Sequence, residues 1–426
     1  MKTTIAGAAT VSFGGILPGF SARSYGRIAG ANERILVAGM GVNDRGLRVA
    51  RSFAGQPDCE ILYVCDVDSR AADKCIADVE KIQQRRPKSQ PDFRKALDDK
   101  ELDVLVVTAP DHWHVPASIL ACQAGKHVYV EKPLSHNPHE GELLIEVVKK
   151  YDRVVQMGNQ RRSTPTTIAA IQDLHSGVIG RPYFAKTWYT NDRESIGKGK
   201  QEAVPSWLNY DLWQGPAPRR PYRDNLIHYN WHWFWHWGTG EACNNGVHTV
   251  DLARWGLGVD FPVRITSAGG RYRFQDDWET PDTQNINMEF DNNTLITWEG
   301  RSCNNKRVEG NGNGVIFYGE TGSLLIEGGG YKVFDMDNTV VREVKREGST
   351  GDLHIRNFFD GIRKNARLNS DIQGGHKSTL LVQLGNIAQR TGRTLNVDPT
   401  NGHILNDNEA MKYWRREYEP GWEPKV

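Results

Sequence analysis

The sequence predicts an α/β protein with an N-terminal Rossmann domain and a C-terminal α/β domain that carries a large, open, mainly antiparallel sheet. The chain has 426 residues, enough for roughly two or three domains. As far as Met157, short apolar runs alternate with amphipathic stretches of about ten to fifteen residues, which is typical of βαβ units and a parallel sheet. Beyond Gly158 the runs become longer and alternating, which is typical of antiparallel strands.

Composition excludes several classes of protein. Hydrophobic residues make up 38% of the chain and charged residues 25%, as expected for a folded protein with cores. The formal charge of +1 argues against a general nucleic-acid binder and against a polybasic membrane-surface protein. The six cysteines form no C-x-x-C pair and no Cys/His cluster of zinc spacing, so we expect neither a metal site nor a disulfide framework.

Residues 1–30 are predicted to be a signal-like or disordered N-terminal segment. Positions 4–20 are small and apolar and are interrupted by Pro18, and Ser21 and Ala22 follow, as at a secretory cleavage site. The run is too short and too rich in glycine for a good transmembrane helix, so we expect no stable membrane insertion. Only Lys2 is charged, and the segment resembles a twin-arginine signal whose arginines lie upstream. The expected location is periplasmic or exported; a disordered tail would leave the protein cytoplasmic.

The first predicted domain covers residues 31–157 and is dinucleotide-binding. Its expected strands are 34–38, 61–65, 104–108, 127–130 and 154–157, and its expected helices end near 53 and span 70–84, 116–124 and 138–150. The second domain, 158–426, is predicted to bind substrate and to form oligomers. Its expected strands are 183–189, 263–273, 283–290, 294–298, 314–318, 323–327 and 331–334, with helices at 165–176, 353–363 and 378–391. Residues 204–240, rich in proline and aromatic side chains, are predicted to cover a site.

A glycine-rich turn between the first strand and helix predicts a dinucleotide site. Gly39, Gly41 and Gly46 would let backbone N–H groups approach a pyrophosphate at a helix N-terminus. Asp66 ends the next strand, where a carboxylate can accept hydrogen bonds from ribose hydroxyls and would repel a 2′-phosphate. NAD is therefore favoured over NADP, although Arg70 lies close in sequence. The alternative is a structural βαβ unit that binds no cofactor.

Several motifs resemble those of the Gfo/Idh/MocA oxidoreductases. Residues 124–133 read AGKHVYVEKP, and residues 106–114 read VVTAPDHWH, which matches the family's strand and loop beside the nicotinamide. Further matches are LWQGP at 212–216, GVHTVD at 246–251 and NFFDGI at 357–362, while WHWFW at 231–235 is similar to the exported sugar-active members. The resemblance covers nearly the whole chain from Asn32. It implies a Rossmann domain followed by an α/β domain with an open antiparallel sheet.

The resemblance implies that Lys132 and His248 are catalytic. Lys132 stands in the family's E-K-P motif, where a buried lysine can transfer a proton because its pKa falls readily. His248 stands in a D-x-x-x-H-x-x-D arrangement, whose spacing places the three residues on one face of a helix. Here Asn244 replaces the first acid and Asp251 is the second. An amide binds a sugar hydroxyl but takes no proton, so proton abstraction would depend on His248 and Lys132.

The same resemblance implies the remaining contacts. The residues expected at the cofactor are Gly39, Gly41, Asn43, Arg45, Gly46, Asp66, Thr108, Pro110, His112, His114, Glu131, Lys132 and Gln160. The residues expected at the substrate are Arg161, Trp213, Trp231, His232, Asn244 and Asp251. For Arg161 and its neighbour Arg162, a salt bridge between the domains is the alternative.

Histidines and tryptophans of the second domain are further candidates. His228, His232 and His236 recur every four residues, which on a helix would resemble a metal face; without a carboxylate at ligand spacing, we interpret them as pocket or structural residues. Candidate surfaces for stacking on a sugar ring are the tryptophans at 188, 207, 213, 231, 233 and 235.

Together these observations predict an NAD-dependent oxidoreductase that acts on a secondary hydroxyl of a sugar, glycoside or cyclitol. One alternative is a redox-neutral NAD-dependent glycoside hydrolase that works through a transient keto-sugar. Another is a non-catalytic NAD-binding protein, suggested by Asn244 in place of an acid. The expected partner is a small molecule, not a nucleic acid, and the resemblance implies a homodimer or homotetramer.

Overall fold

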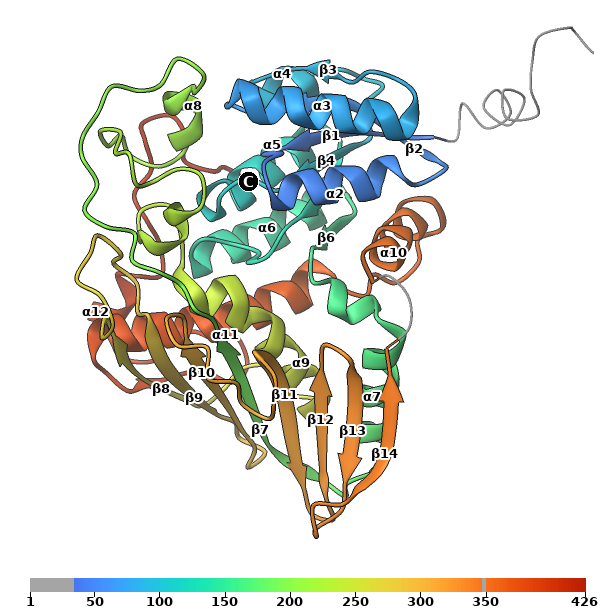
Figure 1. Cartoon of the computed structure of the whole chain (residues 1–426), viewed down its shortest axis with the longest axis vertical. Coiled ribbons are helices and arrows are strands. Elements are labelled where there is room, and N and C mark those ends of the chain that lie inside the picture. Colours follow the sequence, from blue (N-terminus) through green and yellow to red (C-terminus); the bar gives the residue numbers. More distant parts are fainter. Residues whose placement is uncertain (1–33, 347–349) are drawn as a thin grey trace, which may run out of the picture. The chain divides into compact units, whose positions relative to one another are not determined.

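The computed structural model describes residues 34–346 and 350–426 (Figure 1). The segment 1–30, on which we based the expectation of export, lies outside the described residues. Within the described part, no helix is long and apolar enough to cross a membrane. All six cysteines are free thiols.

The N-terminal layer is a parallel sheet, as predicted, and it has six strands where five were expected. Its strands are β1 (Ile35–Met40), β2 (Cys59–Cys65), β3 (Lys88–Ser89), β4 (Val104–Val107), β5 (His127–Val130) and β6 (Val155–Met157), in the order β3-β2-β1-β4-β5-β6. The first described strand, β1, lies in the centre of the sheet, and the strand order reverses between β1 and β4. This arrangement places the carboxyl ends of β1 and β4 at the switch point where α/β sheets bind ligands.

Helices connect these strands, and local sequence signals fix their ends. They are α2 (Arg45–Ala54), α3 (Ser69–Gln83), α4 (Phe93–Leu97), α5 (His114–Gln123) and α6 (Pro138–Tyr151). Asp68 caps α3 by accepting from the amides of Arg70 and Ala71. Asn137 caps α6, whose first residue is Pro138, a position that tolerates the missing N–H.

The second sheet has nine strands in the order β14-β13-β12-β11-β7-β10-β9-β8-β15. Their bounds are β7 (Pro182–Thr190), β8 (Arg264–Gly270), β9 (Thr283–Glu289), β10 (Leu295–Arg301), β11 (Asn313–Gly319), β12 (Ser323–Glu327), β13 (Gly330–Phe334), β14 (Val340–Lys345) and β15 (Leu395–Asn396). Every pairing is antiparallel except that between β10 and β7. The predicted fold class is therefore confirmed.

Helices α7 (Pro165–His175), α9 (Val247–Leu257) and α11 (Ile372–Thr391) share one hydrophobic core with this sheet. Helix α11 also joins the two halves of the protein. The Leu134 amide donates to Thr379 Oγ1 at 3.2 Å, and Gln383 Nε2 donates to the Ser135 carbonyl at 2.9 Å. Most of α11 is buried, so it is packed on both sides.

Several features depart from the predicted elements. The two-residue strands β3 and β15 were not predicted, and α11 begins at Ile372 instead of residue 378. β14 was not predicted, because its valines and charged residues do not alternate and nearly all of them are exposed. The residues before His248 form a π-helical turn, Ala242–Gly246, in place of the regular helix that the spacing suggested. Helix α10 (Thr350–Lys364) follows the second sheet in sequence but packs into the Rossmann core through Ile355 and Phe358.

Residues 204–240 have little regular structure and a small core of their own. They contain α8 (Tyr210–Gln214) and the 3₁₀ turn η4 (Asn230–Trp233), with Trp213 and Trp237 in the core. After α12 (Asn408–Met411), the C-terminal residues run back to the Rossmann domain, where Trp422 packs edge-on against Trp113 with ring centroids 5.3 Å apart.

Candidate active site

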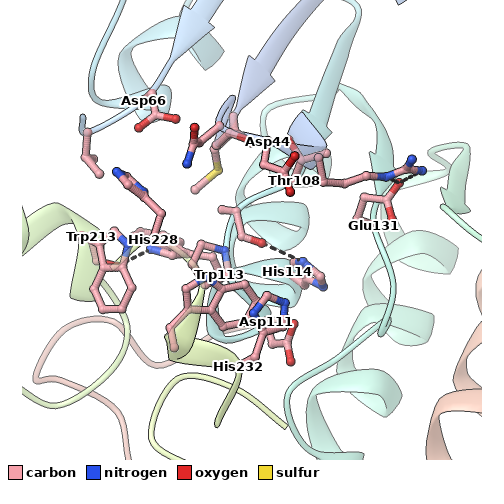
Figure 2. A pocket seen from close by; sticks show the side chains of 18 of the residues that line it. Asp44, Asp66, Thr108, Asp111, Trp113, His114, Glu131, Trp213, His228 and His232 are labelled. Carbon is pink, nitrogen blue, oxygen red and sulfur yellow. Dashed lines mark hydrogen bonds and ion pairs between the residues drawn. The ribbon is translucent and has the colours of Figure 1, made fainter. Parts of the chain in front are cut away.

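The candidate site is a cavity of about 440 Å³ at the carboxyl ends of β1, β2, β4 and β5. Figure 2 shows it between Asp66 near one end and His232 near the other. The Rossmann domain supplies the turns after these strands, and the second domain supplies residues 228–232 and the π-helical turn that leads to His248. One continuous cavity therefore joins the glycine turn to the proposed catalytic residues.

The turn after β1 requires glycine at two positions. Gly41 has φ +78°, and a Cβ there would lie 2.6 Å from the Ala109 backbone nitrogen. A Cβ on Gly46 would lie 1.9 Å from the Gly41 carbonyl oxygen. Helix α2 then starts with no side-chain cap and no acidic residue in its first turn. Its amides can therefore bind an anion, as a pyrophosphate requires.

Asp66 lines the cavity and is held by backbone amides. Val42 N donates to its Oδ2 at 2.6 Å, and Asp68 N donates to its Oδ1 at 2.9 Å. Burial raises the pKa of the Asp66 carboxyl, while these two hydrogen bonds oppose the rise. The carboxylate is thus fixed in one orientation at the cavity wall.

Arg70, the residue that left the choice between NAD and NADP open, is engaged elsewhere. Its guanidinium pairs with Asp68 at 2.8 Å and stacks on the Trp207 ring, 3.4 Å from the ring centroid. His228 Nε2 lies 2.6 Å from Asp68 Oδ2, the carboxylate oxygen to which Arg70 Nη2 also donates. Residues 207–228 are thereby attached to the start of α3.

Glu131 lies on the floor of the cavity and pairs with Arg45 at 2.8 Å. Gln160 Nε2 donates to the same Glu131 oxygen at 2.9 Å and to Tyr129 Oη at 2.8 Å. Burial alone would raise the pKa of Glu131, but Arg45 and Lys132 hold it below its usual range. Glu131 is therefore a fixed anion between the start of α2 and the neighbouring lysine.

Lys132 reaches across to the second domain. Its Nζ donates to the Asn244 carbonyl oxygen at 2.7 Å and to Asn244 Oδ1 at 2.9 Å. Burial lowers the pKa of the Lys132 ammonium, and the charges of Glu131 and Asp111 oppose that change. Two of its three N–H groups are occupied, so one can face the cavity.

His248 lies on the same cavity wall, and its Nδ1 is 2.8 Å from Asn159 Oδ1. With the carbonyl end of Asn159 facing it, Nδ1 carries the proton and Nε2 presents a lone pair. Burial, and after it the positive charges of Lys132 and Arg161, hold the pKa of His248 well below its usual value. The imidazole is therefore neutral near pH 7 and able to accept a proton.

The structure brings most of the predicted residues to this cavity. Those that line it are Gly41, Asn43, Arg45, Asp66, Thr108, Pro110, His114, Glu131, Lys132, Gln160, Trp213, Trp231, His232, Asn244 and His248. Gly39 and Gly46 do not line it; they shape the turn from behind. The roles of the lining residues stay predictions, because a position on the wall shows proximity and not contact with a ligand.

Three assignments need correction. His112 is fully buried, with its ring nitrogens 3.0 Å from the Trp213 carbonyl and 3.3 Å from the Trp237 carbonyl, so it supports residues 213–237 and does not face the cofactor region. Asp251 is buried in an ion pair with Arg162 at 2.8 Å. Arg161 lies outside the cavity lining and donates to Asn313.

The histidine and tryptophan candidates also divide into residues that line the cavity and residues that are held in structural contacts. His228 and His236 bond to Asp68 and to the Pro218 carbonyl respectively, and only His228 and His232 line the cavity. Among the described residues, no group of three or more His, Cys, Asp or Glu side chains could hold a metal ion. Trp188 is buried in the sheet, and Trp233 is buried against Trp278, so neither offers a stacking face.

Sequence reasoning missed two residues with evident roles. Asn159 holds His248, and a single asparagine after a strand gave no signal in the sequence. Asp111 is a buried carboxyl on the cavity wall that accepts a hydrogen bond from Thr239 at 2.5 Å. Burial raises the pKa of Asp111. Its position between Pro110 and His112 in a recognised motif could have identified it.

Comparison with family models matches both halves of the chain. Residues 33–159 match the model described as "Oxidoreductase family, NAD-binding Rossmann fold", and residues 174–423 match "Oxidoreductase family, C-terminal alpha/beta domain". A glycosyl hydrolase family 109 protein of Shewanella baltica is 22% identical over 418 residues, which cover 90% of this chain and 84% of that protein. Three further family 109 proteins and an α-N-acetylgalactosaminidase from Shewanella align over 191 residues, so this chain spans only 41% of their length.

Solved structures share the fold at low identity. The aldose-aldose oxidoreductase of Caulobacter crescentus, complexed with glycerol, superposes with a TM-score of 0.67 at 17% identity and covers 85% of this chain and 100% of its own. The WlbA dehydrogenase of Bordetella pertussis, in complex with NADH and UDP-GlcNAcA, gives a TM-score of 0.64 at 17% identity, with coverages of 86% and 98%.

Proposed function

Because the chain belongs to the Gfo/Idh/MocA oxidoreductase family, we propose that it oxidises a secondary hydroxyl of a sugar, glycoside or cyclitol with NAD. The observation that carries the proposal is the single cavity that joins the glycine turn and Asp66 to Lys132 and His248. The glycine turn and Asp66 would hold a pyridine nucleotide, while Lys132 and His248 line the same cavity, where they would act on the substrate hydroxyl. The chain is thus an oxidoreductase with a Rossmann domain of the NAD-binding kind, and we propose the sugar hydroxyl as its substrate.

The described residues fit a dinucleotide. The uncapped start of α2 offers amides to a pyrophosphate, and Asp66 offers carboxylate oxygens to ribose hydroxyls. NAD is favoured over NADP because Asp66 repels a 2′-phosphate and because Arg70 is held by Asp68 and Trp207. The chemistry that a bound NAD supplies is acceptance of a hydride from the carbinol carbon.

Lys132 and His248 would handle the proton of the reacting hydroxyl. The remaining N–H of the Lys132 ammonium can donate to the substrate oxygen and stabilise its developing negative charge. Neutral His248 can accept the proton on Nε2, since Nδ1 is occupied by Asn159. The stacked pair Trp231–His232, with ring centroids 3.6 Å apart, supplies an aromatic wall against which a sugar ring can lie.

The experiment is incubation of the purified protein with NAD and a panel of sugars, glycosides and cyclitols while the absorbance of the reduced cofactor is followed. We expect reduction with at least one of them and its loss in Lys132→Ala and His248→Ala. The matched control is His175→Ala, a histidine on the exposed end of α7. Failure to reduce NAD or to exchange hydride with any sugar would refute the proposal.

A second candidate function is redox-neutral glycoside hydrolysis through a transient keto-sugar. Two observations favour it: the full-length similarity to a family 109 relative, and Asp111, an additional buried carboxyl on the wall beside Lys132. Elimination of an aglycone needs a second acid or base besides the pair that serves hydride transfer. Release of a chromogenic aglycone without net formation of reduced cofactor would favour this function over net oxidation.

Export and oligomerisation are part of the same proposal and need separate tests. Fractionation of cells that express the gene with its upstream sequence would show whether the mature protein leaves the cytoplasm. Light scattering of the purified protein would distinguish a dimer or tetramer from a monomer. Neither result would change the assignment of the cavity.

A further inference from the structure

Lys132 is half-buried, and among the described residues no carboxylate bonds directly to its ammonium. Its two hydrogen bonds both end on oxygens of Asn244, an amide residue without charge. A buried ammonium held only by neutral oxygens is costly, because burial disfavours the charged form. The charges of Glu131 and Asp111 already favour the ammonium, but in the described part of the chain only Asn244 bonds to it.

Glu241, one turn before Asn244, supplies a carboxylate behind the amide. It is 3% exposed and does not line the cavity. Its Oε1 accepts from Asn244 Nδ2 at 3.2 Å and also from Asn245 Nδ2. The carboxylate thus binds the nitrogen end of the same amide whose oxygen end binds Lys132.

The rest of the network holds Glu241 in place. Arg193 Nε donates to Oε2 at 2.8 Å, and Ser302 Oγ donates to the same oxygen at 3.1 Å. The π-helical turn Ala242–Gly246 begins directly after Glu241 and carries Asn244 and Asn245. Arg193 Nη2 also reaches Oε1, at 3.5 Å, so Oε1 is shared between this arginine and the two asparagines.

We propose that Glu241 is a positioning residue for Lys132: its carboxylate orients the Asn244 amide so that the amide oxygen faces the ammonium. Without this anchor the amide could rotate and point its NH₂ group at Lys132, which would repel the ammonium. Glu241 therefore stabilises the Lys132 ammonium through the Asn244 amide, whereas a carboxylate at position 244 would bind the ammonium directly. The idea depends on the proposed function only in taking Lys132 to act on the substrate.

Other titratable groups near Lys132 also influence its pKa or respond to its charge. The titratable groups that act on Lys132 or are affected by its charge are Glu131, Asp111, Arg45, His232, Cys243 and His248. None of them bonds to Asn244 in the described part of the chain, so substitution of Glu241 leaves their contacts with one another in place.

The experiment measures Lys132 directly, by brief competitive acetylation at a series of pH values and mass spectrometry of the peptide that contains it. The pH midpoint of labelling reports the fraction of neutral amine, and it needs no substrate and no turnover. For Glu241→Gln we expect the midpoint to fall by about one pH unit. A negative charge is lost, and Arg193 and Ser302 hold the one remaining oxygen, which leaves an NH₂ group facing Asn244 Nδ2. Ser302→Ala, which removes a neighbouring hydrogen bond but keeps the carboxylate, should leave the midpoint unchanged.

The double variant Glu241→Gln with Asn244→Asp moves the carboxylate to the lysine itself. We expect it to restore the midpoint to the wild-type value or above. If Glu241→Gln does not fold, Glu241→Asp, which keeps the charge but is one methylene shorter, should show a smaller fall. A midpoint that does not move in the folded variant would overturn the role of Glu241.

Kinetics then separate this role from the proposed function. If a sugar substrate is found, Glu241→Gln should lower kcat about tenfold and change KM for the sugar less, because the amide positions a group that acts in the transition state. Absence of any sugar oxidation would refute the proposed function and leave the labelling result valid. Active wild-type enzyme with an unmoved midpoint in Glu241→Gln would refute only the role of Glu241.

Discussion

Asn159 is the residue through which the tautomer of His248 can be tested. In Asn159→Ala the acceptor 2.8 Å from His248 Nδ1 is lost, and the ring can place its proton on Nε2 instead. A neutral hydrogen bond contributes about 1 kcal/mol, which corresponds to a factor of roughly five in the population of the tautomer that accepts a proton. We therefore expect kcat/KM for sugar oxidation to fall about fivefold.

Asn159→Asp is the matched control, because its carboxylate still accepts from Nδ1. The tautomer is kept, and the nearby negative charge raises the pKa of His248, so the acid limb of the pH profile should move to higher pH. The assay is the initial rate of NAD reduction between pH 6 and 9, with thermal unfolding to confirm that each variant is folded. Equal loss in the alanine and aspartate variants, or no loss in the alanine variant, would refute the assignment of Nε2 as the base.

Three further predictions concern charge and pH. Burial lowers the pKa of Lys132 from the ordinary lysine value of 10.5, so the rate of sugar oxidation should decline with rising pH before pH 10.5 is reached. The pH–rate profile of Lys132→Arg should lack this decline. Asp66→Asn should weaken NADH binding by about 1–3 kcal/mol in a fluorescence titration, because an amide cannot accept from both Val42 N and Asp68 N; equal affinity in both proteins would contradict the role of Asp66. Burial lowers the pKa of His354 to about 4, so between pH 6.5 and 4 the folded protein binds fewer protons than the unfolded chain. The free energy of unfolding therefore decreases by about 3 kcal/mol as the pH is lowered across that window. Urea unfolding of wild type and His354→Gln at pH 7 and pH 4.5 should show a smaller loss in the variant.

The sequence predicted the layers well because their signals are local. Buried parallel strands read as short apolar runs, and the antiparallel strands alternate, so the longer strands of both sheets were predicted with bounds within a few residues. The edge strands β3 and β15 were missed because two residues are too few to form a pattern. Edge strand β14 was missed because its residues face solvent on both sides. The return of α10 to the Rossmann core was missed because long-range packing leaves no periodic signal.

The site residues were predicted from sequence motifs, and the wrong assignments arise because a motif does not show side-chain orientation. A motif places residues near a cavity but does not say which side chains point into it, so His112 and Asp251 were assigned to ligands although both are buried in structural contacts. Asn159 and Glu241 act on the motif residues from outside the motifs. Only coordinates could identify them.

Helix α11 has a consequence for how nucleotide enters and leaves. Its side chains are bonded to the loop after β5 on one side and packed in the core of the second sheet on the other, so a hinge motion that parts the two halves would break both sets of contacts. Exchange would instead require displacement of residues 207–228, which are attached near the start of α3 by His228 and Trp207. A coenzyme that stays bound and is regenerated in place by a second substrate would spare the protein this displacement in every cycle.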